Sequence, residues 1–279
     1  MRDLVTVDWL AEHLHDDDLV VVDASMAPPG STDPLPDDGI PGAVRFDVAG
    51  AMSRHDDADG LGPVGTHDML APADFERALR ALGICSGDRV VAYDAAGMFS
   101  SARAWWMLRA AGVPVAVLDG WLPAWTAAGR PLAPVASTLD REGDVAVAWD
   151  PRAFVDGDAT AAALADGGAA VLDARSPGRF SGAEPDPRGD VRAGHMPGAR
   201  SLHYATLAPG GRMLPVAELD ERLRSAAGEL PIIASCGSGV TAAVVALAAT
   251  LTGRAATVYD GSWSEWGRDG SGRPVVTDE

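Results

Sequence analysis

Short runs of apolar residues alternate with longer segments of helical period along the whole chain. Apolar runs of about five residues, a usual strand length, occupy residues 19–23, 90–94, 169–173 and 232–236. Consecutive apolar residues of this kind are typical of strands that are buried on both faces of a parallel sheet. Between these runs, a helical pattern covers residues 72–82, 102–111, 216–226 and 241–251. Strands and helices that alternate with short loops predict parallel α/β units.

The landmarks of this pattern occur twice, in the same order. A Pro-Gly turn lies at 40–43 and again at 196–199, and an Asp-Gly segment lies at 118–121 and again at 259–262. Between these landmarks, Asp94 closes an apolar run at the position that Cys236 takes in the second half. Such an internal repeat predicts an α/β fold of two tandem domains, each with a small, mostly parallel sheet and helices on both faces.

A stretch between the two copies has the composition of a linker. Residues 131–151 contain three prolines, have mixed polarity and lack a helical period. Features of this kind mark the boundaries between domains. We therefore expect a first domain at residues 1–135, a linker at 136–150 and a second domain at 151–279.

Composition and charge exclude several classes of function. The chain has 279 residues, a formal net charge of −18 and no lysine. Nucleic acids and anionic membrane surfaces need clustered positive charge, so neither is an expected partner. The absence of lysine excludes Schiff-base chemistry on lysine and the phosphate-loop lysine motif. No apolar stretch is long enough to cross a bilayer and the start lacks a signal-peptide pattern, so the expected location is the cytoplasm.

Only two cysteines are present, Cys85 and Cys236, and they lie far apart in the sequence. Neither belongs to a Cys-x-x-Cys pair or a His/Cys cluster, so no disulfide framework and no metal site is expected. Cys236 ends an apolar run, and Gly-Ser-Gly separates it from a helix that begins near Thr241. Glycines let successive N–H groups face one point, and the helix N-terminus adds its positive dipole end, so the loop suits a charged sulfur. The alternative is a buried structural cysteine.

The loop Cys236-Gly-Ser-Gly-Val-Thr241 resembles the active-site loop of the tandem-domain rhodanese family, in its 3-mercaptopyruvate sulfurtransferase branch. Further segments resemble motifs of this family, at residues 173–180, 184–188, 194–199 and 259–266. The resemblance covers nearly the whole chain. It implies that the first domain has lost its cysteine and is non-catalytic, in keeping with the acid at position 94, and that the second domain is catalytic.

The resemblance also implies roles for individual residues. Arg179 and Arg188 match arginines that bind the carboxylate or keto oxygens of the substrate, with surface ion pairing as the alternative for each. Ser238 is expected to hydrogen-bond the reacting sulfur or to relay a proton. His67, from the first domain, is the candidate to assist it, with an exposed loop histidine as the alternative. The remaining loop residues expected to bind the substrate sulfur are Gly237, Gly239, Val240 and Thr241.

The expected activity is transfer of sulfane sulfur from 3-mercaptopyruvate, through a persulfide on Cys236, to a thiol or cyanide acceptor, without a metal or organic cofactor. The neutral Gly237 and Ser238 favour mercaptopyruvate, but one loop sequence does not fix the donor, so a thiosulfate:cyanide sulfurtransferase is the alternative. A phosphatase of related fold needs an arginine where this chain has Ala242. A non-catalytic persulfide-sensing or binding module would be expected to lose the cysteine or the arginines. The family also implies thioredoxin as a candidate acceptor.

Overall fold

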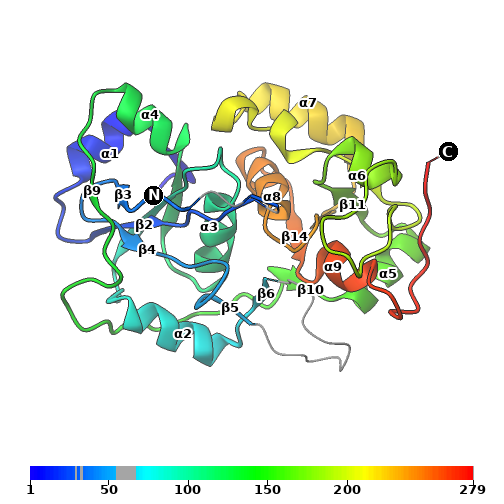
Figure 1. The fold of residues 1–279 in the computed structure, drawn as a ribbon, viewed down its shortest axis with the longest axis horizontal. Coiled ribbons are helices and arrows are strands. Elements are labelled where there is room, and N and C mark those ends of the chain that lie inside the picture. Colours follow the sequence, from blue (N-terminus) through cyan, green and yellow to red (C-terminus); the bar gives the residue numbers. More distant parts are fainter. Residues whose placement is uncertain (29, 32–33, 55–66, 279) are drawn as a thin grey trace. The chain divides into compact units, whose positions relative to one another are not determined.

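The computed structural model describes residues 1–28, 30–31, 34–54 and 67–278 (Figure 1). Within them the chain forms two compact units. Unit 1 comprises the described residues of 1–53, 69–151 and 210–213, and unit 2 comprises those of 54–68, 152–209 and 214–278. The segment predicted as a linker joins unit 1, since Ala136 donates its N–H to the Ala43 carbonyl oxygen (3.0 Å). The domain boundaries expected at 135 and 151 stay predictions.

Unit 1 is built on a five-stranded sheet with the order β1-β8-β7-β2-β4, in which every pairing is parallel. Its strands are β1 (Leu4–Val5), β8 (Val115–Leu118), β7 (Arg89–Tyr93), β2 (Leu19–Asp23) and β4 (Val44–Arg45). The central strands β2 and β7 are buried from their second residue onward. Burial on both faces explains why these strands read as continuous apolar runs.

Unit 2 repeats this arrangement, with the order β10-β14-β13-β11-β12 and only parallel pairings. Its strands are β10 (Phe154–Val155), β14 (Ala256–Tyr259), β13 (Ile232–Ser235), β11 (Ala170–Asp173) and β12 (Arg200–Ser201). The register repeats as well, because Asp23 pairs with Tyr93 in unit 1 and Asp173 pairs with Ser235 in unit 2. The prediction of two parallel α/β units with one topology is confirmed.

The helices of unit 1 are α1 (Val7–His13), α2 (Pro72–Ala81), α3 (Ser101–Ala110) and α4 (Trp121–Ala127). Helices α1 and α4 pack on one face of the sheet, where Leu10 and Trp125 form a core with Val21. Side chains alternate along a strand, so Val22 faces the other side, and it is fully buried too. Helix α3 contacts β7 and β8 and is buried except at Arg109. The helices predicted at 72–82 and 102–111 are confirmed to within one residue.

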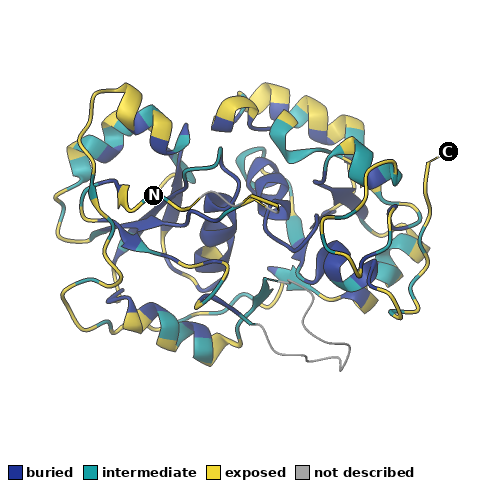
Figure 2. Cartoon of the chain, viewed as in Figure 1, coloured by how far each residue is buried: buried dark blue, intermediate teal, exposed yellow. Residues whose placement is uncertain are grey.

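The helices of unit 2 are α5 (Gly157–Asp166), α6 (Pro177–Ser181), α7 (Val216–Ala227), α8 (Ala242–Leu251) and α9 (Ser262–Trp266). Residues of α5 and α9 share a core with Val171 and Ile233 on one face of the sheet. Helix α8 contacts β13 and β14 and is buried over its first eight residues, as its uniformly apolar sequence requires. Helix α7 packs on α8 and exposes its polar side, which is the yellow stripe of α7 in Figure 2.

Short elements complete the two units. β3 (Asp38–Gly39) pairs with β9 (Ala133–Pro134), and β5 (Ser53–Arg54) pairs with β6 (Asp68–Met69). Two 3-10 helices cover Tyr204–Thr206 and Pro209–Gly211. Both predicted Pro-Gly turns form, and Gly42 and Gly198 have φ of +79° and +87°, as the third position of a type II turn requires. Across the described residues, no helix combines the length and apolar composition that crossing a bilayer requires.

Candidate active site

Cys236 lies at the carboxyl end of β13, in the middle of the unit 2 sheet, and its side chain is 2% exposed. Its backbone N–H donates to Ser262 Oγ (3.1 Å), and its carbonyl oxygen accepts from the N–H of Trp263 (3.0 Å). The chain then turns sharply at Gly239, which has φ of +79°, and enters α8 after the N-cap residue Thr241. The carboxyl ends of parallel strands are where open α/β sheets bind ligands.

Two serines of α9 hydrogen-bond the backbone of this loop. Ser264 donates both its N–H and its Oγ to the Gly237 carbonyl oxygen, each at 2.8 Å. Ser262 accepts the Cys236 N–H and donates to the Tyr259 carbonyl oxygen (2.8 Å). Ser262 has φ of +48°, a left-handed conformation that costs a non-glycine residue about 1–2 kcal/mol. The two hydrogen bonds of its hydroxyl offset that cost and fix the backbone at the cysteine.

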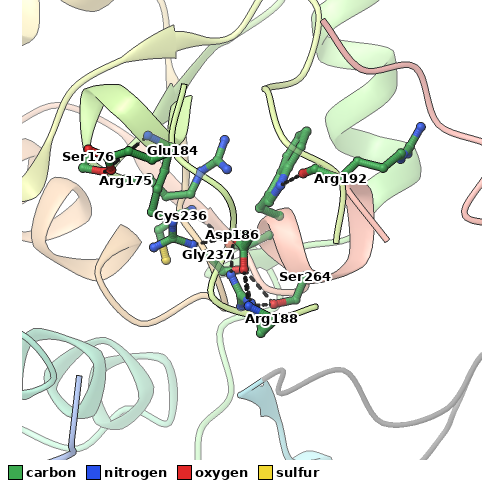
Figure 3. A network of polar contacts seen from close by, with 12 residues as sticks. Arg175, Ser176, Glu184, Asp186, Arg188, Arg192, Cys236, Gly237 and Ser264 are labelled. Carbon is green, nitrogen blue, oxygen red and sulfur yellow. Dashed lines mark hydrogen bonds and ion pairs between the residues drawn. The ribbon is translucent and has the colours of Figure 1, made fainter. Parts of the chain in front are cut away.

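Arg179 and Arg188 reach the same point of the loop from different segments. Arg179 lies on α6, and Arg188 lies in the segment that follows it. A Cβ atom placed on Gly237 would lie 2.8 Å from Arg188 Nη2 and 3.1 Å from Arg179 Nη2. A side chain at position 237 would therefore shift the guanidinium of Arg188 away from the place that it takes beside this loop. The structure brings the cysteine loop and both predicted arginines together, and Figure 3 shows Arg188 beside Gly237 and Cys236.

Asp186 joins the two arginines. Its carboxylate accepts from Arg179 Nη2 at 2.5 Å, and from Arg188 Nε at 2.7 Å and Nη2 at 3.0 Å. Arg188 also donates through Nη1 to Ser264 Oγ, so it is held on two sides (Figure 3). Burial by itself would raise the pKa of Asp186, but the hydrogen bonds and charges of Arg188 and Arg179 outweigh it and lower the pKa to about 2. The sequence interpretation gave Asp186 and Ser264 no role.

The equivalent loop of unit 1 carries Asp94, which follows β7 directly as Cys236 follows β13. Gly97 has φ of +78°, close to that of Gly239, and each glycine lies three residues beyond the acid or the cysteine. The Asp94 carboxylate accepts four backbone N–H groups at 2.8 to 3.1 Å, from Ala96, Met98, Ser100 and Ser101. The loop of unit 1 is thus an anion cradle that is filled by its own carboxylate.

The other predicted residues have defined places but untested roles. Ser238 and Val240 are buried in the loop, with exposures of 8% and 2%. Thr241 is the N-cap residue of α8 and is also buried. His67 immediately precedes β6 and is partly buried. The catalytic and binding roles of these residues stay predictions.

A comparison with models of known protein families shows which family has this fold and this site. The rhodanese-like domain matches the chain twice, at residues 6–128 and 157–269. The chain belongs to the rhodanese family. The two rhodanese domains account for the repeated sheet order, and the tandem rhodanese architecture expected from the sequence is confirmed.

Several characterised rhodanese proteins are similar to this chain over nearly its whole length. The 3-mercaptopyruvate sulfurtransferase of Escherichia coli K12 is 40% identical over 94% of both chains. The thiosulfate/3-mercaptopyruvate sulfurtransferase 1 of Arabidopsis thaliana, a mitochondrial protein, is 33% identical over 94% of this chain and 75% of its own. The crystal structure of SseA from Escherichia coli has a TM-score of 0.82 and 37% identity, and it covers 95% of this rhodanese chain and 100% of its own.

Proposed function

We propose that this chain is a 3-mercaptopyruvate sulfurtransferase that carries sulfane sulfur as a persulfide on Cys236. The name of the Escherichia coli relative supports the reaction and the donor. The observation that carries the proposal is the filled cradle of unit 1, where four N–H groups bind the Asp94 carboxylate. The loop after Cys236 likewise has a glycine of positive φ three residues on, and it is suited to bind a negatively charged sulfur instead.

The lengths of the two side chains support a persulfide in particular. In Asp94 the charged oxygen is the third atom from Cα, after Cβ and Cγ. In a persulfide on Cys236 the charged outer sulfur is likewise the third atom, after Cβ and Sγ. We therefore expect the loop of unit 2 to fit the loaded cysteine more closely than the free thiolate, whose charge lies one bond nearer to the backbone.

The first half-reaction loads the cysteine. The Cys236 thiolate attacks the sulfur of 3-mercaptopyruvate, the new S–S bond forms, and the C–S bond of the donor breaks. The electron pair of that bond moves to the carbon that becomes the methyl group of pyruvate, which leaves as the enolate. The proton of the donor thiol moves to this carbon, so the products are pyruvate and an anionic persulfide. Ser238, with His67, is the proposed relay for this proton.

The arginines bind and orient the donor. Arg179 and Arg188 are 20% and 17% exposed in their side chains, and their Nη2 atoms lie beside Gly237. A guanidinium binds a carboxylate through parallel hydrogen bonds, so this pair suits the carboxylate and keto oxygens of mercaptopyruvate. Correct orientation places the donor sulfur against Sγ of Cys236, which is the step that proximity accelerates.

The second half-reaction returns the enzyme to its free form. An acceptor thiolate or cyanide attacks the outer sulfur, the S–S bond breaks, and Cys236 leaves as a thiolate. Thioredoxin in the cytoplasm is the proposed acceptor, as the resemblance to the family implies. Thiosulfate is the alternative donor, because the Arabidopsis relative is named for both donors. The neutral Gly237 and Ser238 favour the donor with a single carboxylate.

The test is the intact mass of the purified protein after incubation with 3-mercaptopyruvate or, separately, with thiosulfate. We expect a gain of one sulfur atom that cyanide removes, and a larger yield from mercaptopyruvate. Cys236→Ser should abolish the gain, whereas Cys85→Ser, which changes the other cysteine, should retain it. A wild-type protein that gains no sulfur from either donor would overturn the proposal and favour a binding module.

A further inference from the structure

We propose that Asp186 is a positioning and specificity-determining residue, which fixes both donor-binding arginines and gives their pocket a net charge suited to a donor with one negative charge. The inference rests on the proposed function and names a residue that sets its donor class. Asp186 lies between Arg179 and Arg188 and binds both guanidiniums. Neither the donor nor the acceptor needs to touch it for this role.

The exposures show which groups a donor can reach. The Asp186 side chain is 2% exposed, whereas those of Arg179 and Arg188 are 20% and 17% exposed. A donor therefore meets the guanidiniums and not the carboxylate behind them. Because Arg188 Nε and Nη2 are both occupied by Asp186, its orientation is fixed before the donor arrives. Binding then costs less side-chain entropy than it would with free arginines.

The charge of this cluster follows from its three members. Two guanidiniums and one carboxylate give a net charge of +1. Mercaptopyruvate with a protonated thiol carries one negative charge and neutralises the cluster, whereas thiosulfate carries two. The ion pairs keep Asp186 charged, with a pKa of about 2, so the cluster retains this net charge at every pH at which the enzyme would be assayed. Asp186 therefore disfavours the dianionic donor.

The decisive variant is Asp186→Asn, which keeps the size of the side chain and raises the net charge of the cluster to +2. We expect the ratio of kcat/KM for thiosulfate to kcat/KM for mercaptopyruvate to rise about tenfold or more, since one unit charge at a few ångströms has at least that effect at the dielectric of a partly buried site. The ratio should also fall with added salt more steeply than in the wild type.

Two further variants separate charge from structure. Asp186→Glu keeps the negative charge and should keep the donor ratio near the wild-type value. Asp186→Ser also removes the charge and takes the place of Asp186→Asn if that variant does not fold. An equal loss with both donors in a folded Asn or Ser variant would overturn the inference, as would a Glu variant that behaves like Asn. If the proposed function itself were wrong, the wild type would form no persulfide, so that outcome can be told apart from the ones above.

Discussion

Replacing Asp94 by alanine tests whether the loop of unit 1 is held by its own carboxylate. The substitution removes the acceptor of four backbone N–H groups, and three of these bonds are buried, those from Met98, Ser100 and Ser101. The fourth donor, Ala96, is partly exposed and can turn to water. A buried donor that loses its acceptor costs about 1–3 kcal/mol. Three such donors predict a loss of about 4 kcal/mol after some relaxation, or about 10 °C in Tm.

Two comparisons make this prediction sharper. Asp94→Asn retains one carbonyl oxygen but points an NH2 group at N–H donors, so its loss of stability should approach that of Asp94→Ala. Asp17→Asn removes an acid from an exposed position and should change stability by less than about 0.5 kcal/mol. The free energies of unfolding come from urea titrations followed by circular dichroism. The same samples, loaded with donor, report whether unit 2 still accepts sulfur.

The emptied cradle should also bind an added anion. With the carboxylate gone, the N–H groups of Met98, Ser100 and Ser101 still converge on one point, and inorganic sulfate should raise the Tm of Asp94→Ala more than that of the wild type. Loss of stability equal to that of Asp17→Asn, or a sulfate response equal to that of the wild type, would refute the reasoning. In that case the hydrogen bonds of Asp94 would not be what holds the loop.

Two other substitutions test the site of unit 2. Gly237→Ala places a Cβ atom 2.8 Å from Arg188 Nη2, so it should raise KM for mercaptopyruvate by about tenfold. Steady-state rates measure this effect, and an unchanged KM would contradict it. Glu265→Gln concerns stability, because burial raises the pKa of Glu265 even though Tyr259 and Arg273 lower it. A carboxyl group whose pKa is higher in the folded protein than in the unfolded chain stabilises the fold at pH values below its pKa in the unfolded chain. This stabilisation is lost as the pH rises through its pKa in the folded protein. The wild type should therefore lose stability from pH 4.5 to neutral pH relative to Glu265→Gln, and parallel unfolding curves would contradict this.

The repeated fold could be predicted because local sequence determines its landmarks. The buried strands read as apolar runs, and the run predicted at 19–23 is β2 (Leu19–Asp23). The turns at Gly42 and Gly198 need glycine for steric reasons, so their Pro-Gly pairs predicted them directly. The helix predicted at 216–226 is α7 (Val216–Ala227), since its apolar positions recur with a helical period. Each of these signals lies within a few residues of the element that it predicts.

The connections behind the site could not be predicted in this way. Ser264 binds Arg188 across 76 positions of sequence, and nothing in either local segment indicates the other partner. Asp186 lies two residues from Arg188, so an ion pair between them could have been considered, but its bond to Arg179 depends on how α6 and the following loop fold. The sequence did show Asp94 at the position of the cysteine in the other repeat, but it did not show that the carboxylate accepts four backbone N–H groups of the loop that follows.

The two repeats place an acid and a cysteine at the same point of one sheet topology, directly after β7 and β13. In unit 1 the charge belongs to Asp94 and is always present, so its four hydrogen bonds serve stability alone. Under the proposed function, the matching charge of unit 2 arrives only when a donor loads Cys236 with sulfur, and the outer sulfur is then as many bonds from Cα as the charged oxygen of Asp94. Loading would then give this loop a negative charge that the free thiol lacks. On this reasoning the loop around Cys236 contributes to the stability of the loaded enzyme, which drives sulfur transfer from the donor and preserves the persulfide until an acceptor arrives.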